Sequence, residues 1–207
     1  MNVPTLDLSK FISGIDKERK AFSDDLGHSF NQTGFAIIKN HGLKKELTDE
    51  LYKVIKAFFD LEDEKKIKYY FPDLYGQRGY VVKGQEHAKG SKKGDLKEFF
   101  HIGNPSISNP QNIWPHEVES FNEIGSEVFI TLENIGLTLL RAISMYLNLD
   151  INYFEDKVKG GESILRSIHY FPLDPSDISD GAVRAAAHGD INFCLLYTSP
   201  SPRDLRK

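Results

Sequence analysis

Cysteine is almost absent from this chain, and neither sign of charge is in large excess. Cys194 is the single cysteine among 207 residues, so no intrachain disulfide and no cysteine-based zinc site can form. The 26 basic and 30 acidic residues give a formal net charge of −4. This near balance argues against binding to nucleic acid or to an anionic membrane through bulk charge. A single cysteine is typical of a reducing compartment, and we expect a cytoplasmic protein.

Three kinds of segment are also missing. No uninterrupted apolar run approaches the ~20 residues that a membrane helix needs, which argues against a membrane protein. The first eight residues have neither the basic nor the apolar region of a targeting segment. No glycine-rich phosphate loop follows a predicted strand, so nucleotide binding has no support. The composition, 40% hydrophobic and 27% charged, is nevertheless that of a folded globular protein with a buried core.

Hydrophobic periodicity predicts helices early in the chain and strands mainly towards its end. Apolar residues recur at spacings of three and four in three segments, most clearly in the last, where core packing explains the pattern. These predicted helices are residues 15–32, 44–60 and 117–148. The predicted β-strands are residues 3–8, 34–39, 96–102, 162–173 and 183–196. This order favours an α+β fold over alternating strand-helix-strand units.

His188, Gly189 and Asp190 form the sharpest chemical pattern in the sequence. On a strand, residues two apart point to the same face, so the imidazole of His188 and the carboxylate of Asp190 would converge. This pair suits Fe(II), Mn(II) or a similar ion, and with one more histidine it would make a facial triad. Taken alone, the pair could equally be a hydrogen-bonded or surface pair. Its apolar surroundings favour partial burial, where a carboxylate needs a partner such as a metal.

Several other segments carry specific patterns in a fixed order. Residues 33–42 read Thr-Gly-Phe-Ala-Ile-Ile-Lys-Asn-His-Gly, and residues 95–100 read Asp-Leu-Lys-Glu-Phe-Phe. Together with five further segments they resemble the isopenicillin N synthase-like family of non-haem iron oxygenases, most of which use 2-oxoglutarate. Those further segments are residues 3–8, 58–65, 79–80, 165–170 and 184–190.

The resemblance implies a fold, a set of cofactors and roles for particular residues. The implied fold is a double-stranded β-helix, or jelly roll, with N-terminal helices and a long central helix. His188 and Asp190 would bind Fe(II), and Tyr170 would contact 2-oxoglutarate or the substrate, with Phe171 as its alternative in another register. The implied reaction uses 2-oxoglutarate and O2 to hydroxylate, desaturate or cyclise a small molecule. The segment with Lys97 and Glu98 would be mainly structural, and we assign neither residue to catalysis.

The sequence also departs from the family pattern after Asp190. The family has a second histidine ligand 50–60 residues after the first and then an Arg-x-Ser that grips 2-oxoglutarate, and neither follows His188 here. We therefore expect an incomplete barrel and a longer parent protein. Residues 1–115 would form the N-terminal region, 116–196 the first part of the barrel, and 197–207, rich in proline, serine and basic residues, a foreign or disordered tail. A truncated paralogue is the alternative.

Two histidines are candidates for the missing ligand, and other functions remain open. His169, beside the site strand, is the better stand-in, and His101 is the other; alternatively, both are hydrogen-bonded in the core or the site wall. One rival to the 2-oxoglutarate enzyme is an oxidase that works without 2-oxoglutarate, as isopenicillin N synthase does. The other is a non-catalytic relative. The sequence specifies neither the substrate nor the oligomeric state.

Overall fold

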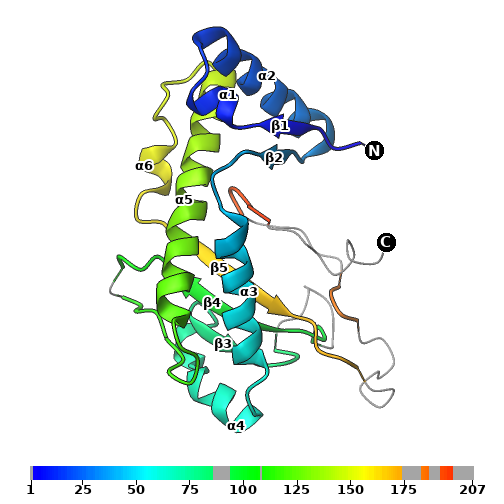
Figure 1. The fold of residues 1–207 in the computed structure, drawn as a ribbon, viewed down its shortest axis with the longest axis vertical. Coiled ribbons are helices and arrows are strands. Elements are labelled where there is room, and N and C mark those ends of the chain that lie inside the picture. Colours follow the sequence, from blue (N-terminus) through cyan, green and yellow to red (C-terminus); the bar gives the residue numbers. More distant parts are fainter. Residues whose placement is uncertain (1, 86–93, 108, 174–182, 187–191, 198–207) are drawn as a thin grey trace.

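The computed structural model describes residues 2–85, 94–107, 109–173, 183–186 and 192–197. Two small sheets and one long helix organise these residues (Figure 1). The first sheet pairs two strands in parallel and the second pairs three strands antiparallel, in the order β3-β4-β5. Helices and sheets occur together, as the α+β prediction requires.

The first unit holds the N-terminal elements. Its parts are β1 (Thr5–Asp7), α1 (Ser9–Ile12), α2 (Asp16–Thr33) and β2 (Ile37–Lys39). α2 begins where the Glu18 carboxylate accepts a hydrogen bond from the backbone N–H of Ile15, at 3.2 Å. It ends at Gly34, whose φ of 76° is left-handed, a conformation that glycine adopts without a steric penalty. The predicted helix at 15–32 is confirmed. The strands predicted at 3–8 and 34–39 form over their shorter cores, β1 and β2, and Gly34 belongs to the end of α2 instead of to a strand.

The second unit contains the antiparallel sheet, the helices α3 (Lys45–Phe59) and α5 (Phe121–Tyr146) that pack against it, and shorter elements. Two 3₁₀ turns, Ile67–Tyr69 and Pro72–Leu74, lie among them. The other helices and strands are α4 (Asp63–Lys66), β3 (Gly79–Val81), β4 (Glu98–Gly103), α6 (Glu155–Val158) and β5 (Ile164–His169). α3 packs along α5 (Figure 1). The helices expected at 44–60 and 117–148 and the strands expected near 96–102 and 162–173 are confirmed, with slightly different ends.

α5 connects two hydrophobic cores. Its first half contributes Phe121 and Val128 to a core shared with α3, β3 and β4. Its second half contributes Ile135 and Leu139 to a core shared with β1, α1 and α2. The periodic apolar stripe of the sequence is therefore core packing, as predicted. By length and hydropathy alone, α5 is also a helix that could cross a membrane, although a core helix passes the same test.

β4 is the central strand of the antiparallel sheet, and all six of its residues are buried. Its side chains alternate between two faces. Phe100 and Ile102 point into the core with α3 and α5, and Glu98 belongs to the same alternating set. A carboxylate is therefore placed at the end of an apolar row.

The strand predicted at 183–196 is wrong for the residues that the structure describes. Residues 183–186 and 192–197 are bends or irregular chain. A strand persists through a ladder of backbone hydrogen bonds. Among the described residues, one backbone-to-backbone bond, from Leu96 N–H to the Val183 carbonyl at 2.9 Å, joins this segment to the chain before it. The apolar side chains of Val183 and Phe193 are exposed, 46% and 66%, so the apolar pattern of this run does not reflect burial at these two positions.

The close approach of α2 to α5 generates a stability prediction. A Cβ atom at Gly27 would lie 2.3 Å from the ring of Tyr146, whereas one at Gly136, in α5, would meet its nearest neighbour at 3.7 Å. We expect Gly27→Ala to lower the free energy of unfolding by about 1–3 kcal/mol, because the helices must separate. Gly136→Ala is the matched control and should raise it by up to about 1 kcal/mol through helix propensity. Urea unfolding followed by circular dichroism measures both, and equal effects would contradict the close packing.

Candidate functional site

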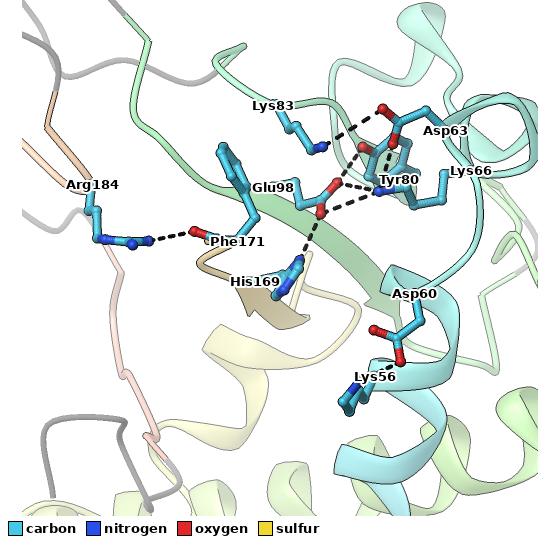
Figure 2. Close-up of polar contacts among 10 residues, drawn as sticks. All are labelled: Lys56, Asp60, Asp63, Lys66, Tyr80, Lys83, Glu98, His169, Phe171 and Arg184. Carbon is cyan, nitrogen blue, oxygen red and sulfur yellow. Dashed lines mark hydrogen bonds and ion pairs between the residues drawn. The ribbon is translucent and has the colours of Figure 1, made fainter. Parts of the chain in front are cut away.

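A buried carboxylate lies at the start of β4. Glu98 has no exposed surface and accepts hydrogen bonds from three side chains (Figure 2). Lys66 Nζ of α4 lies 3.1 Å from Oε2, the Tyr80 hydroxyl of β3 also donates to Oε2, and His169 Nδ1 of β5 lies 2.7 Å from Oε1. A carboxylate only accepts, so Nδ1 of His169 carries the proton. Four separate elements therefore meet at one charged group.

The partners of Glu98 determine its ionisation. Burial alone would raise the pKa of Glu98, but the hydrogen bonds from His169, Tyr80 and Lys66 outweigh it and hold the pKa below the ordinary value. Burial likewise acts to lower the pKa of Lys66, but hydrogen bonds to Asp63 and Glu98 raise it overall. Burial, reinforced by the hydrogen bond to Glu98, raises the pKa of Tyr80. Glu98 and Lys66 therefore form a charged pair, and Tyr80 stays neutral.

Strand register brings His169 to this carboxylate. Glu98 and His169 are direct partners in the β4–β5 pairing, so their side chains lie on the same face. The imidazole also stacks on the ring of Phe59, with centroids 4.8 Å apart. His169 is thus held on one side by charge and on the other by an aromatic ring, at the last residue of β5.

The residues after β5 lead to the predicted co-substrate contact. Tyr170 follows His169 directly and is 38% exposed. The next residue, Phe171, accepts a hydrogen bond on its carbonyl from Arg184 Nη1 at 3.0 Å, and Lys83 Nζ lies 4.9 Å from its ring centroid (Figure 2). The role of Tyr170, and of Phe171 as its alternative, stays a prediction.

A second buried charge pair lies just before β4. Asp95 and Lys97 form an ion pair at 2.7 Å, and both side chains are almost fully buried. Asp95 Oδ1 also accepts a hydrogen bond from the backbone N–H of Ala186 at 3.2 Å. Because Ala186 lies two residues before His188, this contact joins the loop before β4 to the segment that enters the predicted metal pair.

His188 and Asp190 themselves lie outside the described residues, so their assignment as metal ligands stays a prediction. Within the described part of the chain, no three His, Cys, Asp or Glu side chains form a group that could hold a metal. The two histidines considered as extra ligands are both hydrogen-bonded there, His169 to Glu98 and His101 to the carbonyl of Gly76. Both side chains therefore agree with the alternative given above, in which they are hydrogen-bonded in the core or the site wall.

Sequence reasoning missed the importance of Lys66 and Asp95. Lys66 lies in a run of charged residues that reads as solvated surface, and no local signal distinguishes it from its exposed neighbours. Glu98 did carry a signal, because a charged residue directly precedes two phenylalanines in a predicted strand. A charge within a buried strand requires a partner, and the partners come from sequence-distant elements.

Comparison with known proteins assigns the family. Residues 3–117 match the family described as "non-haem dioxygenase in morphine synthesis N-terminal", a segment that includes the Glu98 cluster apart from His169. The chain belongs to the family of non-haem, 2-oxoglutarate- and Fe(II)-dependent oxygenases. The family resemblance drawn from the sequence is therefore confirmed.

Individual relatives agree with the family assignment. The chain is 31% identical to the 2-oxoglutarate-dependent dioxygenase ecdK of Aspergillus rugulosus, over 95% of this chain and 64% of that protein. It is 32% identical to a leucoanthocyanidin dioxygenase of Malus domestica, over 92% of this chain and 53% of that protein. The chain thus spans between about half and two thirds of the length of these curated relatives.

Solved structures show the same relationship in three dimensions. A full-length Neurospora crassa protein, crystallised in complex with alpha-KG, superposes with a TM-score of 0.80 at 28% identity, over 91% of this chain and 61% of that one. A 2OG-Fe(II) oxygenase family protein from Caulobacter crescentus gives a TM-score of 0.76 at 36% identity, over 92% and 62%. The arrangement of helices and sheets described above is therefore that of 2OG-Fe(II) oxygenases.

The Glu98 cluster generates a prediction for stability. Glu98→Gln leaves the buried Lys66 ammonium without its buried counter-charge, so we expect a loss of about 3 kcal/mol in the free energy of unfolding at pH 7. Asp49→Asn is the control, because Asp49 pairs with Lys45 on the exposed side of α3 and should change stability by less than about 1 kcal/mol. Urea titrations of the three proteins measure both. A loss at Glu98 no larger than that at Asp49 would contradict the cluster.

The same carboxylate predicts a pH dependence. The folded-state pKa of Glu98 lies below its ordinary value of 4.5, so its stabilising contribution is complete above about pH 4.5 and is lost as pH falls through the folded pKa. The stability difference between wild type and Glu98→Gln should therefore shrink with falling pH in that window. Urea unfolding from pH 7 to pH 3 measures it. Parallel curves would show that Glu98 has no depressed pKa.

Proposed function

We propose that the protein containing this chain is a 2-oxoglutarate- and Fe(II)-dependent oxygenase that oxidises a small organic molecule. The similarity to 2-oxoglutarate-dependent dioxygenases, which extends over 92–97% of the chain, carries this proposal. A neighbour solved in complex with alpha-KG and with thymine supports a small-molecule substrate. The names of these relatives favour 2-oxoglutarate as co-substrate over the oxidase alternative.

The donor atoms in the sequence fit Fe(II) in kind. His188 offers an imidazole nitrogen and Asp190 a carboxylate oxygen, which are two of the three protein ligands of a facial triad. When bound, Fe(II) together with 2-oxoglutarate supplies the activation of O2 that drives substrate oxidation. His188 and Asp190 would hold the metal, and Tyr170 would orient a carboxylate through its hydroxyl. The hydrogen bond between His169 and the buried carboxylate of Glu98 would hold the end of β5, directly before Tyr170, in place.

We also propose a barrel type, a division of the chain into regions and a cellular compartment. We infer a double-stranded β-helix from the 2OG-Fe(II) oxygenase neighbours, with residues 1–115 as an N-terminal region, 116–196 as the first part of the barrel and 197–207 as a tail. The antiparallel β3-β4-β5 sheet would form part of one wall of such a barrel, and its presence supports this proposal. The single cysteine supports a cytoplasmic location.

Metal binding tests the proposed function directly. We expect the chain to bind Mn(II), a stand-in for Fe(II) that air does not oxidise, and His188→Ala or Asp190→Ala to weaken binding at least about 100-fold, more than the loss of an outer-shell partner. His28→Ala is the control, since His28 is exposed and contacts the ring of Tyr146. Electron paramagnetic resonance of free Mn(II) measures the affinity.

Two results would count against the proposal. Unchanged affinity in both variants would remove His188 and Asp190 from the metal site. A wild-type chain that binds neither Mn(II) nor 2-oxoglutarate would favour the non-catalytic alternative for this chain.

A further inference from the structure

Residues 95–98, here called the anchor segment, contact both parts of the chain that lead into the predicted site. The segment supplies Asp95, Lys97 and Glu98, three charged side chains that are all buried. Burying charge is unfavourable unless each group is paired, and here each one is, Asp95 with Lys97 and Glu98 with Lys66.

The first contact holds the backbone that leads into His188 and Asp190. Asp95 Oδ1 accepts from Ala186 N–H at 3.2 Å, and Leu96 N–H donates to the Val183 carbonyl at 2.9 Å. Residues 183–185 are exposed, so burial of apolar surface holds this stretch only weakly. Polar contacts to the anchor segment therefore carry much of its attachment.

The second contact holds the end of the strand that leads into Tyr170. Glu98 Oε1 binds His169 Nδ1 at 2.7 Å, one residue before Tyr170. Arg184 then donates to the carbonyl of Phe171, one residue after Tyr170, at 3.0 Å (Figure 2). The two site-bearing segments are thus joined to the anchor segment and to each other.

We propose that Asp95 and Glu98 are positioning residues for the oxygenase site. Asp95 fixes the backbone at Ala186, two residues before His188 in the sequence, and Glu98 fixes the end of β5, directly before Tyr170, through the His169 imidazole. This inference rests on the proposed function and adds two positioning residues to it. It also assigns a role to the Asp-x-Lys-Glu pattern of the sequence beyond packing.

The test of Asp95 uses two variants that differ in a single acceptor. Asp95→Ala with Lys97→Met removes the buried pair together, so no charge is left unpaired, and methionine keeps an apolar stem over the ring of Phe99. Asp95→Asn with Lys97→Met restores an oxygen that can accept from Ala186. We expect hydrogen exchange at the Ala186 amide, followed by NMR on the full chain, to be about fivefold faster in the alanine variant than in the asparagine variant.

The test of Glu98 breaks its contact from the other side. His169→Phe keeps an aromatic ring against Phe59 and leaves Glu98 bonded to Lys66 and Tyr80, so the buried charge stays paired. We expect faster exchange at the amides of Tyr170 and Phe171 and weaker binding of 2-oxoglutarate. Exchange at Ala186 should stay as in wild type, because its acceptor is Asp95.

Ligand affinities separate positioning from general packing. We expect the alanine variant at Asp95 to weaken Mn(II) binding while its Tm stays close to that of the asparagine variant, which should recover the affinity. Equal exchange and equal affinity in the two Asp95 variants would overturn the proposal for Asp95. Wild-type exchange at Tyr170 in His169→Phe would overturn it for Glu98. If the exchange pattern is as expected but wild type binds no Mn(II), the anchoring stands and the proposed function fails.

Discussion

A carboxylate withdrawn from solvent at the start of β4 constrains much of this structure. Glu98 is charged, and it keeps that charge only while Lys66, Tyr80 and His169 donate to it. Those three residues come from α4, β3 and β5, so the charge can be satisfied only when these elements have assembled. The requirement is directional, unlike hydrophobic burial, and it fixes the register of the sheet as well as its packing.

One of the hydrophobic cores along α5 holds the sheet in the position that the Glu98 cluster requires. The core of α3, β3 and β4 holds the face of the sheet that carries Glu98, Phe100 and Ile102 against α5. Hydrophobic burial supplies most of the stability, because these side chains are large and almost completely removed from water. The charged pairs at the edge of that core select one strand register, because their partners meet only in that register. Stability and positioning thus come from neighbouring parts of one strand.

Much of the fold could be predicted from the sequence, because its helices and strands carry clear local periodicity. The stripe of 117–148 became α5, and the segment around Phe99 became β4. In the described parts of 183–196 the predicted strand is wrong, because an apolar run forms a strand only where a partner strand supplies the ladder. The site was less predictable. The pattern at His188 and Asp190 drew attention to a metal pair, but the contacts of Lys66 and Asp95 depend on long-range pairing that no local pattern encodes.

The metal site that we propose should lie beside the segments held by Asp95 and Glu98. Paramagnetic broadening tests this placement: Mn(II) is added to the isotopically labelled chain, and the loss of amide NMR signals is mapped onto the sequence. We expect the signals from residues 183–186 and 169–171 to broaden first, at low Mn(II), while those of α2 persist. Broadening centred on the exposed acidic residues of α2 or α3, or no selective broadening at all, would contradict it.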